Sequence, residues 1–328
     1  MDKELHDKFI EVAKEKISDK TNFASVLADL LSIKKEAIYR RLRGEVFFTF
    51  SEMVIVSRKL DISLDYVAGM ASPYRSLLFY LHVENYARME EVDYRMTAEY
   101  IAAIHRAGSL PYSEFGYATT IIPLHFSLLH EPFYYLYILK WFYQTGSYGT
   151  RLFSEISFNA RQKKLNEQFL KEVMSIKYTY YIWDELFLTY MLNDINYFYS
   201  IHLMSNADML LMKKEIEHFL TRLEQLAIQG AYRNGNKVDI YVSNLNFETT
   251  YYYLSSDTEN ISMISTFSVG AATSVEKSAC KQMKTWIQAL KRTSTLISCS
   301  AEKERISFFE KQRTTLKKFF DSFEHQNS

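Results

Sequence analysis

Residues 22–69 carry four short amphipathic helical patterns in about fifty residues, and this segment constrains the fold more than any other part of the chain. In each pattern, apolar side chains recur three or four residues apart, as on a helix with one buried face. The pattern over residues 34–43 also holds five basic residues and one acidic residue. The segment therefore predicts a bundle of short helices that presents positive charge.

Two of these helices are expected to be joined by a tight turn at Ser32-Ile33. Ala28 lies where they should cross most closely, since a larger side chain would push them apart. In the second helix Ile38 and Leu42 should point inward, which leaves the basic residues outside. The apolar face of the first helix is made by Val26, Leu27, Leu30 and Leu31. A packed helix, a turn and a helix with a free outer face are the parts of a helix-turn-helix motif.

Together these features resemble the helix-turn-helix domain of the lambda-repressor/Cro (Xre-like) transcriptional regulators. The resemblance covers about fifty of the 328 residues, and the C-terminal region resembles no family that we can name. The family usually has Gly at the turn, where this chain has Ser32. It also commonly has Ala near Ser57 and Gly near Asp61, and both departures are tolerable.

The resemblance implies that residues on the second helix contact duplex DNA. Lys35, Glu36, Tyr39 and Arg40 occupy the positions that read base edges in the major groove. Arg can bind guanine through two hydrogen bonds, and Glu can accept one from cytosine. Two further basic residues, Lys34 and Arg43, are expected to contact phosphates and so to fix the register on the duplex.

The ends of two helices can also be placed from the sequence. Gly44 should end the cationic helix in a left-handed conformation, as the family's glycine does after its recognition helix. Thr49 and Glu52 have the spacing of an N-terminal capping pattern for the helix that follows.

The chain as a whole has no net charge, because 39 Lys and Arg residues balance 39 Asp and Glu residues. Any DNA affinity must therefore come from a local patch.

The stretch 118–143 is the most hydrophobic, but charged residues and a proline interrupt it, so no membrane span is expected. The N-terminus is charged and lacks the apolar core of a signal peptide. Cys280 and Cys299 match no zinc spacing and are interpreted as free thiols. We expect a cytoplasmic protein.

The fold is expected to be mainly α, because Gly and Pro are scarce (9 and 4) and Tyr and Phe are abundant. We predict an all-α helix-turn-helix domain over residues 1–71, with a linker at Ala71-Ser72-Pro73. A helical region over 73–230 follows, and its clearest helix begins after a cap at Asn206. Residues 231–328 should form a small α+β part, in which the strand around Ile240 begins an antiparallel meander.

No motif in the sequence predicts catalysis, a metal site or a cofactor. His125 and His130 are five residues apart and would not converge on one side of a helix. No Walker A or Rossmann glycine pattern is present. The tyrosine clusters at 178–181 and 251–253 most often fill a core or interface, although they could equally line an apolar ligand pocket.

These observations predict a sequence-specific transcriptional regulator and not an enzyme. It should act as a homodimer on double-stranded DNA, since one domain covers only a few base pairs. The C-terminal region would sense an effector, a small molecule or a peptide, or would assemble the dimer. Two alternatives stay open: a helical-repeat protein that responds to peptides, and an enzyme with an appended DNA-binding domain.

Overall fold

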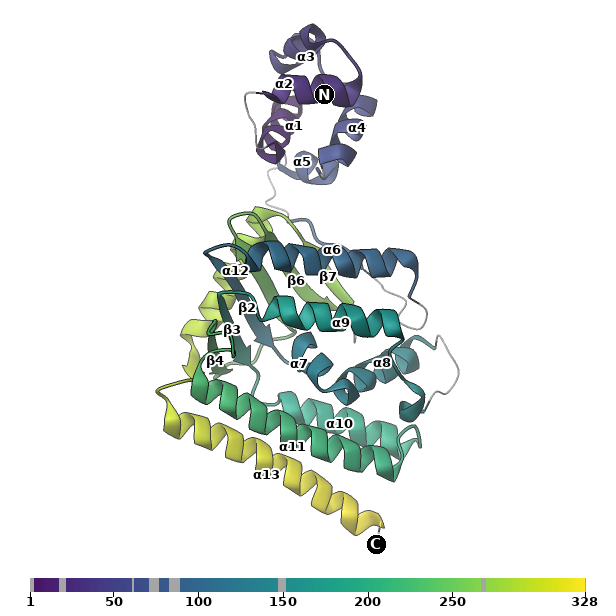
Figure 1. Cartoon of the computed structure of the whole chain (residues 1–328), viewed down its shortest axis with the longest axis vertical. Helices are drawn as coiled ribbons and strands as arrows, with labels where there is room; N and C mark the ends of the chain where they lie inside the picture. The colour runs from purple at the N-terminus through teal and green to yellow at the C-terminus, as the bar shows by residue number, and fades with distance from the viewer. Residues whose placement is uncertain are drawn as a thin grey trace. The chain divides into compact units, whose positions relative to one another are not determined.

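The structure is a computed structural model that describes residues 3–17, 22–60, 62–70, 77–82, 89–146, 152–266 and 270–327. The chain divides into two compact units, Met1–Leu78 and Phe79–Ser328, whose elements are labelled in Figure 1. The linker predicted at Ala71-Ser72-Pro73 lies outside the described residues. Each unit has its own hydrophobic core.

The first unit is all helical in its described residues. Its helices are α1 (Lys3–Lys16), α2 (Phe23–Leu31), α3 (Lys35–Leu42), α4 (Phe50–Leu60) and α5 (Leu64–Met70). Helix α2 packs on α3 and α4, and α1 packs on α4 and α5. The core between them is made by one buried stripe from each helix, with Leu27, Ile38 and Val56 almost fully buried. Helices this short depend on such packing for their stability.

The second unit is built around an eight-stranded mixed sheet in the order β1-β7-β6-β5-β2-β3-β4-β8. The strands are β1 (Tyr80–His82), β2 (Ser113–Thr119), β3 (Tyr178–Trp183), β4 (Lys237–Ser243), β5 (Tyr251–Ser256), β6 (Asn260–Thr266), β7 (Gly270–Ser274) and β8 (Ser294–Leu296). Strands β2, β3 and β4 run parallel to one another. All other pairings are antiparallel.

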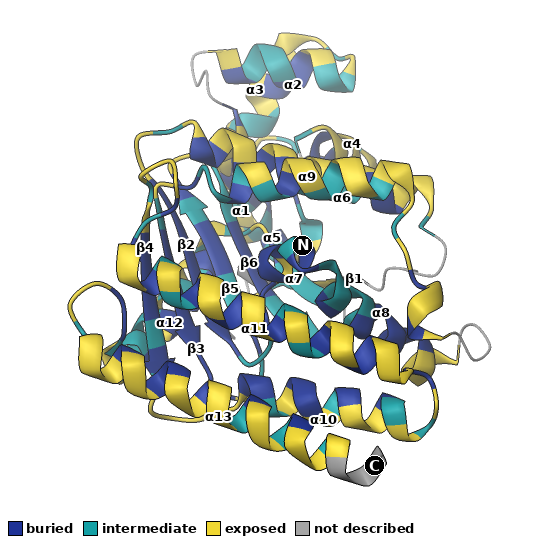
Figure 2. Ribbon diagram, turned by 60° about the horizontal axis from the view of Figure 1, so that its bottom comes forward, coloured by how far each residue is buried: buried dark blue, intermediate teal, exposed yellow. Residues whose placement is uncertain are grey.

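Helices cover both faces of this sheet. They are α6 (Glu91–Gly108), α7 (Leu124–Leu129), α8 (Glu131–Thr145), α9 (Ala160–Val173), α10 (Phe187–Ser200), α11 (Asn206–Gln229), α12 (Lys277–Arg292) and α13 (Glu302–Asn327), with a short 3₁₀ turn at Phe153–Glu155. Alternate residues of β3 point to opposite faces of the sheet and so belong to different cores. Tyr181 and Trp183 pack in the large core with helices α6–α11 and α13. Tyr180 and Ile182 pack in a smaller core against α12. Figure 2 shows the central strands buried between these layers.

Two parts of the predicted fold are corrected by the structure. The region 73–230, which was expected to be helical, contains β2 and β3, and these strands lie in the middle of the sheet. The expected meander is present only as β5, β6 and β7, because the strand around Ile240 pairs with β3 and β8 instead of β5. Strands from both sides of residue 230 therefore share one sheet, and the boundary predicted there does not separate two compact units.

The physical reason lies in the burial of the parallel strands. All seven residues of β2 are buried, and so are five of the six in β3. A strand that is covered on both faces has no polar side to alternate with its apolar side. Its sequence then resembles that of a buried helix, and this explains why β2 and β3 are not predicted as strands.

The helix predicted to begin after a cap at Asn206 begins one residue earlier, at Asn206 itself, and its cap is Ser205. The Ser205 side chain accepts a hydrogen bond from the Asp208 amide (3.2 Å), and the Asp208 carboxylate accepts one from the Ser205 amide (2.8 Å). This reciprocal pair is a capping box. Among the described residues, no helix combines the length and the apolar character needed to cross a bilayer.

Candidate functional site

The turn between α2 and α3 is closed by backbone hydrogen bonds and requires an unfavourable backbone conformation at Ser32. Ser32 ends α2 in the left-handed region, with φ of 55° and ψ of 40°. The Ile33 amide donates to the Ala28 carbonyl (3.1 Å) and the Ser32 amide to the Asp29 carbonyl (3.3 Å). A residue with a Cβ is disfavoured in this region by roughly 1–2 kcal/mol. The turn is therefore held by its hydrogen bonds and by packing behind it.

Replacing Ser32 with glycine is expected to stabilise the first unit by about 1 kcal/mol, because glycine enters the left-handed region without strain. Hydrogen exchange of the α2 and α3 amides in the full-length chain should slow by about fivefold. Ser32→Ala is the matched control, since alanine meets the same steric strain as serine. Faster exchange in Ser32→Gly than in the parent would contradict the strained turn.

Helix α3 is held between the turn and a glycine stop. Ile38 is fully buried on its inner face. At its end, the Glu45 amide donates to the Arg40 carbonyl (2.9 Å) and the Gly44 amide to the Arg41 carbonyl (2.9 Å). Gly44 has φ of +75°, so the predicted left-handed stop is confirmed. The two hydrogen bonds are those of a Schellman motif.

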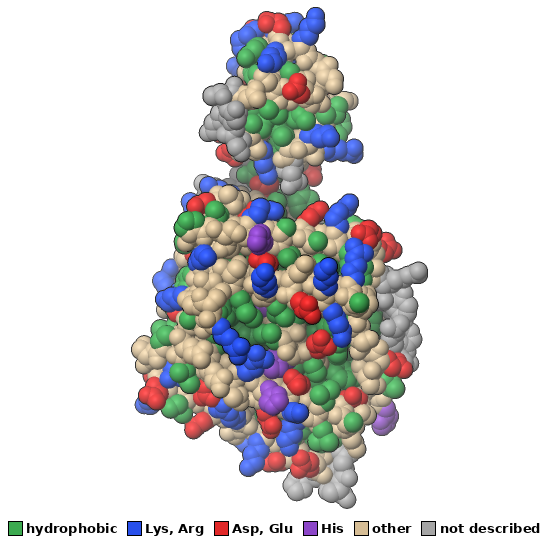
Figure 3. Space-filling model, in the orientation of Figure 1, with side chains coloured by type: hydrophobic (Ala, Val, Ile, Leu, Met, Phe, Trp, Pro, Cys, Tyr) green, Lys and Arg blue, Asp and Glu red, His purple; other side chains and the backbone are tan. Residues whose placement is uncertain are grey.

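The six residues predicted to contact DNA share one property in the structure: all are exposed. They are Lys34, Lys35, Glu36, Tyr39, Arg40 and Arg43. Tyr39 retains 45% of its surface although it is aromatic. In Figure 3, Lys and Arg side chains with acidic ones among them lie over the end of the first unit where Figure 1 draws α3. The outer face of α3 is thus free of the unit's own core.

Arg41, the remaining basic residue of α3, has a different place. Its guanidinium donates to both oxygens of Glu52 (3.1 and 2.7 Å) and to the Ala37 carbonyl (3.1 Å). Glu52 also accepts from the Thr49 amide (2.8 Å), which confirms the predicted cap of α4. Burial raises the pKa of Glu52, but the hydrogen bonds from Arg41 and Thr49 outweigh it and lower the pKa. Arg41 therefore fastens α3 to α4.

Glu45 holds two of the predicted contact residues. Its carboxylate accepts two hydrogen bonds from Arg43 (2.6 and 3.3 Å) and lies 3.5 Å from the Arg40 guanidinium. The Arg43 hydrogen bonds lower the pKa of Glu45, so it stays ionised. A phosphate that bound either arginine would have to displace this carboxylate or share the guanidinium with it. The sequence places an acidic residue directly after the helix stop, but this competition was not predicted.

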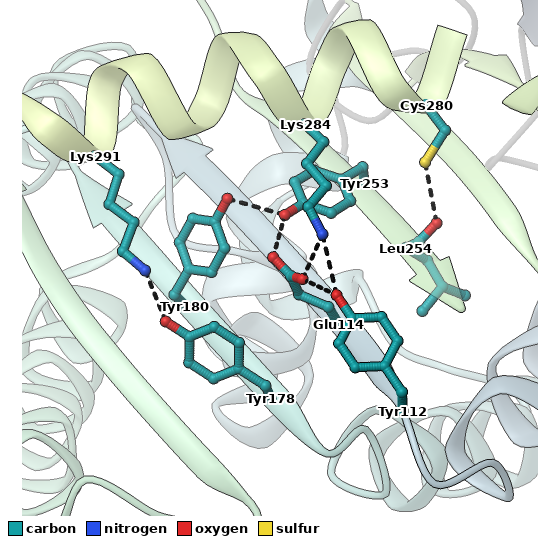
Figure 4. Close-up of polar contacts among 9 residues, drawn as sticks. All are labelled: Tyr112, Glu114, Tyr178, Tyr180, Tyr253, Leu254, Cys280, Lys284 and Lys291. Carbon is teal, nitrogen blue, oxygen red and sulfur yellow. Dashed lines mark hydrogen bonds and ion pairs between the residues drawn. The ribbon is translucent and has the colours of Figure 1, made fainter. Parts of the chain in front are cut away.

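A second cluster of charged and phenolic groups lies in the other unit, between the sheet and α12 (Figure 4). Glu114 of β2 accepts hydrogen bonds from Tyr112 and Tyr253, and its carboxylate lies 2.6 Å from the Lys284 ammonium. Lys284 also donates to Tyr112 (3.0 Å). Burial raises the pKa of Glu114. The hydrogen bonds to its carboxylate, among which that from Lys284 has the largest effect, outweigh burial and lower the pKa, so the carboxyl stays ionised.

This cluster brings together groups that could act in acid–base catalysis, and they lie up to 172 residues apart in the chain. Both oxygens of Glu114 already have partners inside the cluster, however. A substrate would have to break an internal hydrogen bond of a carboxylate that is 6% exposed. The cluster is therefore better explained as a structural contact that joins α12 to the sheet.

The sheet beneath this cluster is shaped by a close approach at Gly116. A Cβ at this residue would lie 2.4 Å from a ring carbon of Tyr253 and 2.7 Å from the phenol oxygen of Tyr180. Those two phenols share a hydrogen bond (3.0 Å). Farther along α12, Lys291 donates to Tyr178 (2.7 Å), and its ammonium lies 4.4 Å from the centre of the Tyr180 ring. Both lysines of this face are thus used within the unit.

The histidines considered in the sequence have separate partners. The His125 ring nitrogen Nε2 lies 2.7 Å from the Tyr181 hydroxyl, while His130 Nδ1 lies 2.9 Å from Glu215. Within the described ranges, no group of three or more His, Cys, Asp or Glu side chains is placed to hold a metal ion. Cys280 is buried and Cys299 is exposed, and both thiols are free.

Comparisons with known proteins give no further guidance: no family model, no curated protein and no solved structure matches the chain.

Proposed function

We propose that the chain is a sequence-specific DNA-binding transcriptional regulator that binds duplex DNA through α3. The observation that carries this proposal is that all six predicted contact residues, which lie in α3 and at its two ends, are exposed while Ile38 is buried. The left-handed turn at Ser32 and the stop at Gly44 support it, because they bound a short helix of the kind that enters the major groove.

The proposed regulator acts as a homodimer. One helix-turn-helix reads only a few base pairs, and a two-fold pair doubles the contacts on a palindromic site. Sequences selected from a random duplex pool by the full-length protein should therefore be palindromic, with half-sites about one helical turn, or a multiple of it, apart. Selection of a single unpaired half-site would contradict the dimer.

Arg40→Ala is expected to abolish the preference for the selected sequence over random DNA. One bidentate base contact discriminates by about 1–3 kcal/mol, and a dimer makes it twice. Competition binding at fixed salt measures the ratio of the two affinities. Arg58→Ala is the matched control, because Arg58 is an exposed arginine of the same unit on α4. If Arg40→Ala is folded and its ratio of affinities for selected and random DNA is unchanged, Arg40 and α3 do not determine the sequence preference.

Glu45→Gln is expected to raise the affinity for duplex DNA of any sequence several-fold. The change releases Arg43 and Arg40 from their carboxylate and removes a negative charge beside the phosphates. The dependence of log K on log salt should steepen by about one unit. Asp65→Asn removes the same charge from the exposed surface of α5 and serves as control. An equal gain in Asp65→Asn would show that only the net charge matters.

A further inference from the structure

A pocket of about 590 Å³ lies in the Phe79–Ser328 unit, lined by α8 and α10. Ile121 lines it two residues beyond the end of β2, and Phe187 lines it four residues beyond the end of β3. The pocket is thus at the carboxyl ends of two parallel strands, which is where open α/β sheets bind their ligands. Its volume is within the usual range of small-molecule sites, roughly 300–1,000 Å³.

The lining combines an apolar floor with a few polar groups. Phe187 and Met191 are almost fully buried, whereas Tyr190 is 43% exposed. The residues come from one face of each helix and from the loop after β2: Ile121, Tyr137, Lys140, Gln144, Phe187, Tyr190, Met191 and Asp194. An apolar pocket with a small number of placed polar groups is the usual composition of a ligand site.

The loop that lines the pocket is fixed by hydrogen bonds from three directions. The Thr119 hydroxyl donates to the Ile121 carbonyl. The Thr120 amide donates to the Thr250 hydroxyl (3.1 Å), and the Ile122 amide donates to the Tyr137 hydroxyl (3.1 Å). These contacts join the end of β2 to the start of β5 and to α8. The site is therefore formed before any ligand arrives, which reduces the entropy lost on binding.

The charged groups of the pocket are one cation and one anion. The Lys140 ammonium lies 2.6 Å from the Asp194 carboxylate, so the pair joins α8 to α10. Their side chains keep 32% and 27% of their surface, so a ligand can reach both. A ligand with a single charge would compete for one partner and leave the other charge partly buried and unpaired. A ligand that carries both charges can satisfy the two side chains together.

We propose that this pocket binds a small zwitterion with an apolar or aromatic side chain, that is, an α-amino acid or a dipeptide. Its carboxylate pairs with Lys140, its ammonium pairs with Asp194, and its side chain lies on Phe187 and Met191. Ligand binding itself goes beyond the proposed function. Its use as the effector of a regulator rests on that function.

The test is calorimetric titration of the full-length protein with L-phenylalanine, L-leucine and the dipeptide Gly-Phe. N-acetyl-L-phenylalanine amide has the same side chain without the charges and serves as the comparison ligand. At least one zwitterion should bind saturably, and the uncharged analogue should bind at least tenfold more weakly. Binding of none of the zwitterions, or equal binding of the uncharged analogue, overturns the proposal.

Three variants and one control locate the site. Lys140→Met and Asp194→Asn should each weaken zwitterion binding at least tenfold, and Ile121→Trp should block it by filling the pocket while both charges remain. Lys213→Met is the control, because Lys213 forms a comparable pair with Glu324 (3.2 Å) between α11 and α13. Equal losses in the control would place the ligand elsewhere and reject the pocket.

Measuring DNA binding by the same samples separates the two proposals. Zwitterion binding that follows the pocket variants supports this site even if the protein binds no DNA. DNA binding with no zwitterion binding removes this site and leaves the proposed function standing. If Lys140→Met or Asp194→Asn lowers the unfolding temperature, Ile121→Trp, which keeps the ion pair, decides whether the pocket is the binding site.

Discussion

Replacing Lys284 with methionine is expected to lower the free energy of unfolding of the Phe79–Ser328 unit by about 3 kcal/mol at pH 7. The change leaves the Glu114 carboxylate, which is 6% exposed, without its cation. Removing one partner of a buried pair costs about 3–5 kcal/mol, and the partial exposure of Lys284 (26%) puts this case at the low end. Denaturant unfolding followed by tryptophan fluorescence measures it, since all three tryptophans lie in this unit.

The pH dependence of this loss gives a second readout. In the parent the pKa of Glu114 is lowered, so its contribution is present above the unfolded pKa and lost as the pH falls. Without Lys284 burial should raise that pKa above the unfolded value, so the variant should recover stability relative to the parent near pH 5. Glu114→Gln added to Lys284→Met should also restore stability, because no buried charge remains. Lys311→Met removes an exposed pair with Glu185 and should change little. A loss that neither low pH nor Glu114→Gln reduces would show that packing, and not charge, is involved.

The second large effect is a loss of stability at acidic pH that depends on His125. The ring is 1% exposed, and burial lowers its pKa from 6.5 to about 3. A histidine with a lowered folded pKa contributes stability above the unfolded pKa, and this is lost as the pH falls. The loss is about 1.4 kcal/mol for each pH unit, hence roughly 2 kcal/mol between pH 6.5 and pH 5. His125 faces aromatic groups, namely Tyr117, Phe126 and Tyr181, and its Nδ1 has no hydrogen-bond partner.

His125→Phe should remove this part of the pH dependence, because the phenyl ring fits an aromatic site and binds no proton. The difference in unfolding free energy between pH 7 and pH 5 should shrink by about 2 kcal/mol relative to the parent. Burial also lowers the pKa of His130, which lies in the same unit, so part of the slope will remain. Phe126→Leu, a change in the adjacent ring, is the control and should lower stability equally at both pH values. If His125→Phe kept the full slope of the parent, His125 would not be the responsible group.

The sequence predicted the turn and the helix ends of residues 22–69 because their signals are local. The turn at Ser32, the stop at Gly44 and the Thr49 cap each depend on residues within a few positions of one another. The exposure of Tyr39 and Arg40 opposite the buried Ile38 follows from the helical period, whereas the assignment of the six residues as DNA contacts rests on the resemblance. The central strands β2 and β3 could not be predicted in this way, because burial on both faces removes the alternation that identifies a strand.

The contacts that the sequence missed join distant positions or depend on side-chain geometry. Glu114 and Lys284 are 170 residues apart, and no local pattern relates them. The ion pairs of Glu45 with Arg40 and Arg43 form only because the chain turns back after Gly44. The pocket at Lys140 and Asp194 requires knowing that α8 and α10 meet where two strands end. In each case the residue types were visible, but their neighbours were not.

The close approach at Gly116 gives a signature by which chains of the same architecture can be recognised. Gly116 is the direct cross-strand partner of Tyr180 on one side and of Tyr253 on the other. Both phenol rings lean into the space that its missing side chain leaves. Any larger residue there would have to be matched by smaller ones on both neighbouring strands. A distant homologue should therefore preserve the three positions as a set, glycine between two aromatics or a bulkier residue between two small ones, even where every other residue has diverged.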